Sequence, residues 1–169
     1  PARSQGEACI PVTDRGLLFG EGVDEVIPAY AGRLFRLPHH LQRLQNSLDG
    51  IRLSNPMDDS AWETVLNELL QRNRSADSPA ADQSVYLQVT RGSVAKRDHA
   101  FPEATPPTVY AVSNPIPEPD PGVTARGVAA ITADDNRWQR CDIKAITLLA
   151  NVLLRQQAVD AGAAEAILV

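Results

Sequence analysis

Hydrophobic residues along the first part of the chain recur with the periods of strands and helices. Residues 16–37 alternate apolar with polar or small residues on either side of Ala31 and Gly32, which predicts a β-hairpin that turns at this dipeptide. In residues 37–53, apolar side chains recur at spacings of 3, 4 and 3, which predicts a helix with one buried face. That face consists of Leu41, Leu44, Leu48 and Ile51.

The middle of the chain holds signals for one more helix and two more strands. The helix is predicted to begin at Ser60, because Glu63 follows three residues later and completes a capping box. Residues 72–84 are polar and predict a loop, and residues 85–92 and 107–116 have the composition of strands. The buried face of the helix is expected to consist of Trp62, Val65, Leu66, Leu69 and Leu70.

A run of prolines suggests a domain boundary. Residues 115–122 hold four prolines in eight positions, so we expect neither helix nor central strand there, but a semi-rigid linker. Residues 1–114 are expected to form a small α+β domain. Residues 123–169 are expected to begin a larger mixed α/β domain, with strands and a helix that Gly162 stops. The chain ends on an apolar run that predicts a strand, so we expect the second domain to be truncated.

Composition narrows the class of protein. The chain is 43% hydrophobic and 22% charged, which is typical of globular proteins. The net charge of −5 and the scattered arginines argue against nucleic acid as a partner. Apolar runs fall short of the roughly 20 residues that a membrane span needs. The two cysteines, far apart in sequence, favour a reducing, cytoplasmic setting. We therefore expect a cytoplasmic protein that handles a small molecule.

Lysine is rare in this chain and one lysine has an unusual context. Of the 16 cationic residues, only Lys96 and Lys144 are lysines, and Lys144 lies between Ile143 and Ala145 in an apolar, strand-like segment. One interpretation is a side chain whose stem covers apolar surface while its amine reaches water. The other is a nucleophilic amine that forms a Schiff base with a carbonyl, a task that arginine cannot perform because it stays protonated.

Three further residues are candidates for binding anions. Arg97 and His99 lie two positions apart in a loop between predicted strands, where both can converge on one carboxylate. Arg43 precedes Leu44 of the apolar helix face and is a candidate for binding a phosphate. Each of these residues also fits a solvated surface. No metal site is expected, because the histidines lack the spacing of metal ligands.

Four blocks of sequence together resemble the fold-type IV pyridoxal-phosphate enzymes, in particular the D-amino acid aminotransferases. The blocks are "DRGLLFGEGVDEV", "HHLQRLQNSLDGIRL", "VYLQVTRG…RDHAFP" and "RWQRCDIKAITLLANVLLRQQAVDAGAAEAILV", in colinear order over nearly all of residues 13–169. The resemblance implies a homodimer with shared active sites. It also implies exchange of an amino group between a D-amino acid, D-alanine or D-glutamate, and a 2-oxo acid.

The resemblance assigns roles to individual residues. Lys144 falls on the lysine that forms the Schiff base with pyridoxal phosphate and moves the substrate proton, and Arg43 falls on the arginine that binds the cofactor phosphate. Arg97 and His99 fall on the pair that binds the substrate α-carboxylate from the neighbouring subunit. Tyr86 falls on a residue that lines the substrate pocket.

Two departures from the family pattern bear on activity. Asp24 stands in "GVDEV" where the D-amino acid enzymes have Tyr, and a carboxylate there would repel the substrate anion unless paired, with Arg97 as the candidate partner. The family's glutamate opposite the pyridine nitrogen is expected beyond Val169. Alternatives are a branched-chain L-amino acid aminotransferase or an aminodeoxychorismate lyase of the same fold, against which "RDHAFP" argues. A truncated, non-catalytic member is a further alternative.

Overall fold

The computed structural model describes residues 4–74 and 82–169, so part of the polar loop expected at residues 72–84 lies outside the described residues. The chain divides into two compact units. Unit 1 comprises residues 1–116 and 142–147, and unit 2 comprises residues 117–141 and 148–169. The first boundary between the units, after residue 116, falls within the linker expected at residues 115–122. The segment that carries Lys144 belongs to unit 1, although it was expected in the second domain.

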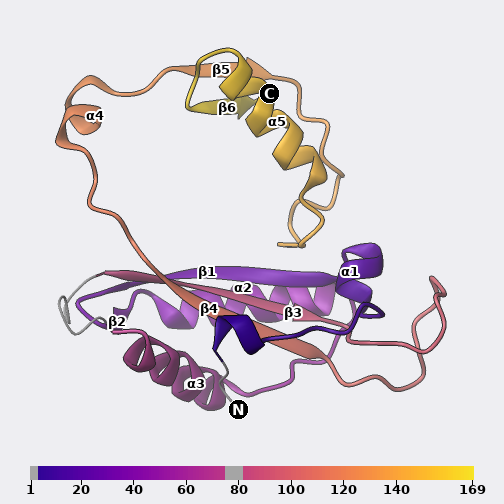
Figure 1. Cartoon of the computed structure of the whole chain (residues 1–169). Helices are drawn as coiled ribbons and strands as arrows, with labels where there is room; N and C mark the ends of the chain where they lie inside the picture. The colour runs from indigo at the N-terminus through magenta and orange to yellow at the C-terminus, as the bar shows by residue number, and fades with distance from the viewer. Residues whose placement is uncertain (1–3, 75–81) are drawn as a thin grey trace. The chain divides into compact units, whose positions relative to one another are not determined.

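Unit 1 is built on an antiparallel sheet of four strands in the order β2-β1-β3-β4 (Figure 1). The strands are β1 (Gly22–Tyr30), β2 (Arg33–Leu34), β3 (Gln83–Thr90) and β4 (Thr108–Pro115). Ala31 and Gly32 form the tight turn between β1 and β2, with φ of 49° and 76°. Positive φ at both central residues suits a two-residue hairpin turn. The predicted turn and the strands β3 and β4 are therefore confirmed.

The predicted hairpin is wrong in its first residues. Instead of strand, they form the short helix α1 (Arg15–Phe19), which follows a single 3-10 turn, η1 (Gln5–Glu7). The Asp14 side chain caps α1 by accepting a hydrogen bond from the backbone of Gly16 at 2.8 Å. Gly20 ends the helix in the left-handed conformation, with φ of 67°. These local capping interactions outweigh the alternating pattern of apolar residues.

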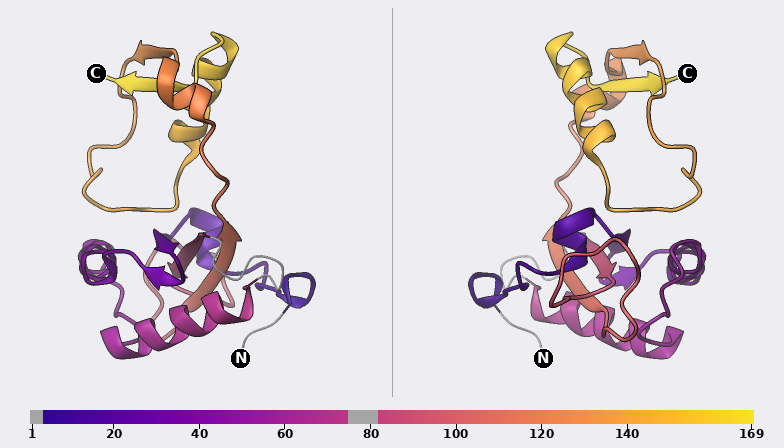
Figure 2. Two further views of the ribbon diagram at one scale, coloured as in Figure 1. Left: turned by 90° about the vertical axis from the view of Figure 1, so that its left-hand side faces the viewer. Right: turned by 90° about the vertical axis from the view of Figure 1, so that its right-hand side faces the viewer.

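Two helices provide the core beneath one face of the sheet. They are α2 (Leu37–Gly50) and α3 (Asp59–Arg72), which lie beside the sheet in Figures 1 and 2. The alternate residues of β1 and β3 that face these helices are buried, as the period of two along a strand requires. The fully buried core side chains of unit 1 include Val23, Ile27, Leu44, Leu48, Trp62, Leu66, Val85, Leu87 and Val89.

The start and the buried face of α3 differ from the prediction. Asp58, and not Ser60, caps the helix: its carboxylate accepts a hydrogen bond from the backbone N–H of Ala61 at 2.8 Å. The expected capping box of Ser60 with Glu63 is therefore wrong, because the helix begins earlier than that motif implies. Val65 is 38% exposed, so its assignment to the core is also wrong. The buried face instead repeats every four residues, at Trp62, Leu66 and Leu70.

Unit 2 contains α4 (Pro121–Arg126), β5 (Ala130–Ala133), α5 (Leu149–Asp160) and β6 (Glu165–Leu168). Strands β5 and β6 pair in parallel, which confirms that the last apolar run is a strand. Residues 121 and 122 of the proline run begin a helix, contrary to expectation, because Pro121 occupies its first turn, where the missing N–H costs nothing. Within the described residues, no helix has the length and apolarity that crossing a membrane requires.

We expect Asp58→Ala to lower the free energy of unfolding by about 0.5–2 kcal/mol, because the first turn of α3 loses its capping acceptor. Ser60→Ala is the matched control and should cost much less, because Ser60 lies inside the helix. Urea unfolding followed by circular dichroism measures both. If Ser60→Ala lowered the free energy of unfolding more than Asp58→Ala, Ser60 and not Asp58 would be the N-cap of the helix.

Candidate active site

The segment that carries Lys144 lies along the edge of strand β1. The Lys144 carbonyl accepts a hydrogen bond from the backbone N–H of Asp24 at 3.0 Å, and the N–H of Ile146 donates to the Gly22 carbonyl at 3.1 Å. Ile143 is buried in the core of unit 1, and the N–H of Lys144 donates to the Ser47 hydroxyl of α2 at 3.1 Å. Strand-like pairing and a buried neighbour therefore fix the backbone at Lys144.

The amine of Lys144 forms an ion pair with Asp24, on the face of the sheet opposite the helices. The distance from Lys144 Nζ to Asp24 Oδ2 is 2.5 Å, and the two side chains are 31% and 3% exposed. The other carboxylate oxygen, Oδ1, is buried and has no hydrogen-bond partner among the described residues. Within this chain the Arg97 guanidinium lies over the Phe19 ring, 4.8 Å from its centroid, and Lys144 is the cation at Asp24. The pairing of Asp24 with Arg97 of a neighbouring subunit stays a prediction.

Glu25 organises a second charged cluster on the covered face of β1. Its carboxylate is fully buried and receives Nε and Nη2 of Arg43 at 2.6 and 2.7 Å, while Nδ1 of His40 lies 2.8 Å away. The hydrogen bond to Glu25 raises the pKa of Arg43, to which the charge of Asp24 adds a smaller contribution. About half of the Arg43 side chain (52%) is exposed. Glu25 therefore fixes one edge of a guanidinium whose other edge remains open to an anion.

Glu25 was not identified from the sequence as a residue of the site, although its position in the strand pattern could have indicated it. It occupies a position of the alternating strand whose neighbours on the same face, Val23 and Ile27, are apolar and fully buried. A carboxylate at such a position requires a charged partner. Arg43, in the middle of helix α2, is that charged partner.

Tyr86 lies on the same open face as Asp24. Its hydroxyl donates a hydrogen bond to Oε1 of Gln88 at 2.7 Å, and its ring centroid lies 6.2 Å from that of Tyr110. Asp24, Gln88 and Tyr110 are direct neighbours across β1, β3 and β4. Burial raises the pKa of Tyr86, and the charges of Asp24 and Tyr110 raise it further. Gln88 and Tyr110 are thus additional members of this surface that the sequence did not reveal.

Arg97 and His99 lie in the loop between β3 and β4, which the rest of unit 1 holds in place. The buried Arg15 donates from Nη1 to the Asp98 carbonyl at 2.6 Å and from Nη2 to the His99 carbonyl at 3.2 Å. The His99 ring lies 5.1 Å from the Phe19 ring. No contact within the described residues joins Arg97 or His99 to Lys144, so the two predicted parts of the site are not brought together in one chain.

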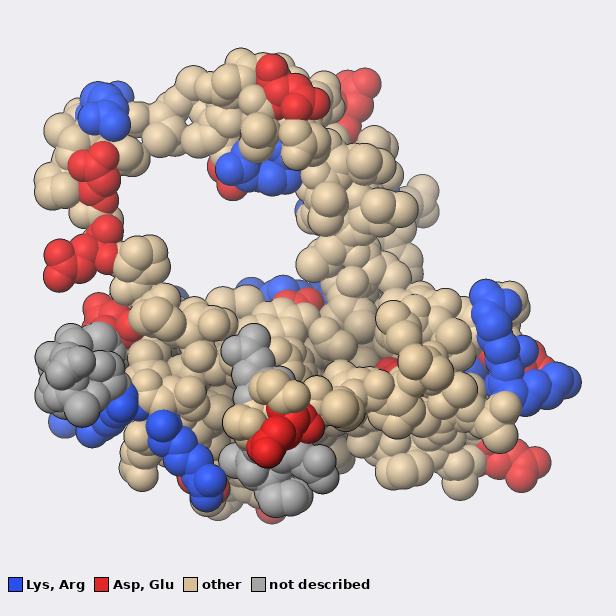
Figure 3. All heavy atoms as spheres, in the orientation of Figure 1, with Lys and Arg blue, Asp and Glu red and all other residues tan. Residues whose placement is uncertain are grey.

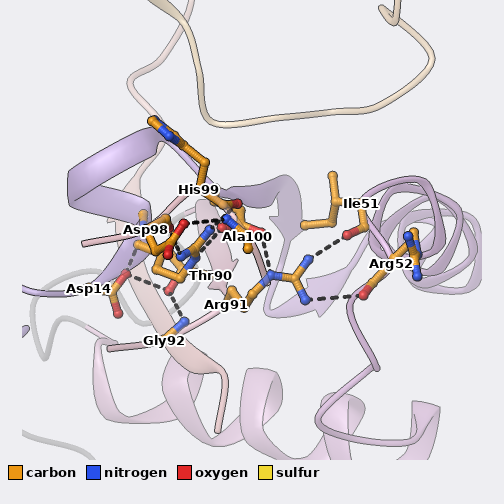
Figure 4. Close-up of polar contacts among 12 residues, drawn as sticks. Asp14, Ile51, Arg52, Thr90, Arg91, Gly92, Asp98, His99 and Ala100 are labelled. Atoms are coloured by element: carbon orange, nitrogen blue, oxygen red, sulfur yellow. Dashed lines mark hydrogen bonds and ion pairs between the residues drawn. The ribbon is translucent and has the colours of Figure 1, made fainter. Parts of the chain in front are cut away.

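One acidic residue ties this loop to the end of helix α2. Glu21 forms ion pairs with both Arg15 and Arg91. Arg91 also donates to the carbonyls of Ile51 and Arg52 at 2.6 and 3.2 Å (Figure 4). Glu21 therefore links the support of the β3–β4 loop to the turn that follows α2.

On the face drawn in Figure 3, lysine and arginine side chains lie in separate places, with acidic side chains near them. This face therefore lacks the basic stripe that phosphate backbones require.

Comparison with known proteins gives consistent results. The family model for amino-transferase class IV matches residues 22–169. A D-alanine aminotransferase from Bacillus licheniformis is 42% identical over 98% of this chain. Among solved structures, a fold IV-transaminase from Curtobacterium pusillum superposes with a TM-score of 0.81 at 21% identity over 99% of this chain. A hypothetical aminotransferase from Mycobacterium tuberculosis, in its PLP-bound form, superposes with the same TM-score at 24% identity and covers 99% of this chain.

These matches cover only part of each similar protein. The chain spans 56% of the length of the Bacillus enzyme, 57% of the Curtobacterium chain and 58% of the Mycobacterium chain. The structural matches establish the fold.

We expect the tyrosinate absorbance of Tyr86 to appear only above the usual tyrosine pKa of about 10, because burial and nearby negative charge favour the neutral phenol. Asp24→Asn should lower the pKa of Tyr86 without restoring its usual value, because burial is the larger cause. Ultraviolet titration measures this, with Tyr86→Phe to assign the signal. The stability that the neutral phenol contributes is present below the unfolded value and is lost as the pH rises through the folded one. An unchanged titration in Asp24→Asn would contradict the proximity of the two groups.

Proposed function

We propose that this chain, which belongs to the amino-transferase class IV family, carries out pyridoxal-phosphate-dependent transfer of an amino group between a D-amino acid, D-alanine or D-glutamate, and a 2-oxo acid. The observation that carries this proposal is the partly exposed amine of Lys144, which is fixed beside a buried carboxylate of strand β1. The similarity to a D-alanine aminotransferase supports the choice of D-amino acids.

The residues of unit 1 fit the demands of pyridoxal phosphate. The cofactor needs one primary amine for its aldehyde and one cationic group for its phosphate. Lys144 offers a partly exposed amine, and Arg43 offers the guanidinium edge that Glu25 leaves free. When bound, pyridoxal phosphate supplies an electron-withdrawing ring that stabilises negative charge at the substrate carbon.

Each protein group then has a defined task in the proposed reaction. Lys144 Nζ would hold the cofactor by its aldehyde and would then carry the proton that leaves the substrate α-carbon. Arg43 would hold the phosphate. Tyr86, whose phenol stays neutral, forms a wall of the substrate pocket.

We further propose a homodimer in which Arg97 and His99 bind the substrate carboxylate at the site of the partner subunit. The side chains of Arg97 and His99 are exposed. The buried Arg15 holds the backbone of this loop through hydrogen bonds to the carbonyls of Asp98 and His99. No contact within the described residues joins them to Lys144, which supports a role at the site of a second copy. Both cysteines are free of disulfides, which supports the proposal of a cytoplasmic setting.

We expect added pyridoxal phosphate to give a visible absorption band with the wild-type protein and with Lys96→Ala, but not with Lys144→Ala. Lys96 is the matched control because it is the only other lysine in the chain. D-alanine should bleach the band. Bleaching by L-leucine alone would leave the cofactor chemistry intact and reject the choice of D-amino acids. A band of equal strength in Lys144→Ala would reject the function.

We expect Arg43→Gln to weaken binding of pyridoxal phosphate by about 10- to 100-fold, the effect of one lost hydrogen bond between charged groups. Arg33→Gln, on the exposed strand β2, should leave it unchanged. Equilibrium titration of the absorption band measures both affinities. If both variants bound pyridoxal phosphate with equal affinity, the proposed role of Arg43 in phosphate binding would be rejected.

A further inference from the structure

The two lysines of this chain have very different surroundings. Lys96 is 87% exposed and lies 3.9 Å from the exposed carboxylate of Asp98, a surface pair that water screens. Lys144 is 31% exposed and contacts the almost fully buried Asp24 at 2.5 Å. Only the second pair includes a carboxylate that solvent does not stabilise.

The Asp24 carboxylate depends on Lys144 for its charge balance. Oδ1 has no hydrogen-bond partner among the described residues, and Lys144 provides the cation at Oδ2. Removal of the amine from this contact would leave Asp24 as a buried anion without a cation, which is strongly unfavourable. The attraction also exceeds that of a surface pair, because less water lies between the charges.

The backbone contributes to the same arrangement. The Lys144 carbonyl and the Asp24 N–H are hydrogen-bonded, so the two residues are neighbours through both main chain and side chain. An amine that is hydrogen-bonded to a carboxylate must leave that contact before it can attack a carbonyl. The pair therefore limits how fast the amine reacts.

Building on the function proposed above, we propose that Asp24 is a positioning residue for Lys144. Its buried carboxylate holds the amine of the cofactor-free protein in a fixed position beside β1 and restrains its reaction with electrophiles. Asp24 thus acts on the reactive amine of the protein, and not on the carboxylate of the substrate.

The test is competitive acylation of the cofactor-free protein with succinimidyl acetate at neutral pH. In this reaction an amide bond forms at a neutral amine, the hydroxysuccinimide anion leaves with the bonding electrons, and water takes up the proton of the amine. Peptide mapping by mass spectrometry gives the rate at Lys144 relative to the rate at Lys96 in the same sample.

We expect Asp24→Asn to raise the relative rate at Lys144 by about fivefold to tenfold, the effect of losing a partly buried ion pair. Asp24→Glu retains the charge and should keep the rate low. Asp98→Asn is the matched control at the surface pair and should change the rate at Lys96 by less than about twofold. An unchanged rate in Asp24→Asn, or equal rates in the Asn and Glu variants, would overturn the proposal.

A second measurement needs no variant. In wild-type protein grown with isotope-labelled lysine, the Lys144 ammonium should give a nuclear magnetic resonance signal protected from exchange with water, and Lys96 should not. Two equally unprotected lysines would also overturn the proposal. Neither test uses pyridoxal phosphate. If Lys144 is restrained but pyridoxal phosphate gives no absorption band, only the proposed function is rejected. If the band appears but Lys144 is not restrained, only the proposed role of Asp24 is rejected.

Discussion

A buried carboxylate must have a cationic partner, and strand β1 carries two buried carboxylates at adjacent positions. Because successive side chains of a strand point to opposite faces, Asp24 and Glu25 demand a cation on each face of the same sheet. Lys144 meets the first demand and Arg43 the second. The two groups proposed to bind the aldehyde and the phosphate of one cofactor are thus positioned by neighbouring residues of one strand.

The remaining parts of unit 1 make this arrangement rigid. Helix α2 carries Arg43 and His40 against Glu25, and its apolar stripe anchors it to the sheet. Its Ser47 hydroxyl also holds the backbone of the Lys144 segment. The helix therefore connects both charged pairs, although it lies on only one face of the sheet. A shift of α2 would therefore disturb the surroundings of Arg43 and of Lys144 together.

Sequence patterns predicted what depends on local periodicity and missed what depends on contacts between distant segments. Helix α2 follows from the spacing of apolar residues, and strands β3 and β4 follow from their composition. Helix α1 does not, because five residues are too few to show a helical period and a cap at Asp14 decides its conformation. Lys144 was recognisable from its apolar neighbours. Its partner was not, because 120 residues separate Asp24 from Lys144 and nothing in the local sequence links them.

The order of synthesis gives this long separation a further consequence. The ribosome adds roughly 5–20 residues per second, so β1 emerges on the order of ten seconds before the lysine that it will contact. During that interval the edge of β1 near Gly22 has no backbone partner, and Asp24 has no cation. An unpaired strand edge favours misassembly, and Asp24 can be buried at low cost only once its cation is available. The nascent chain thus passes through a vulnerable period that ends only when Lys144 arrives.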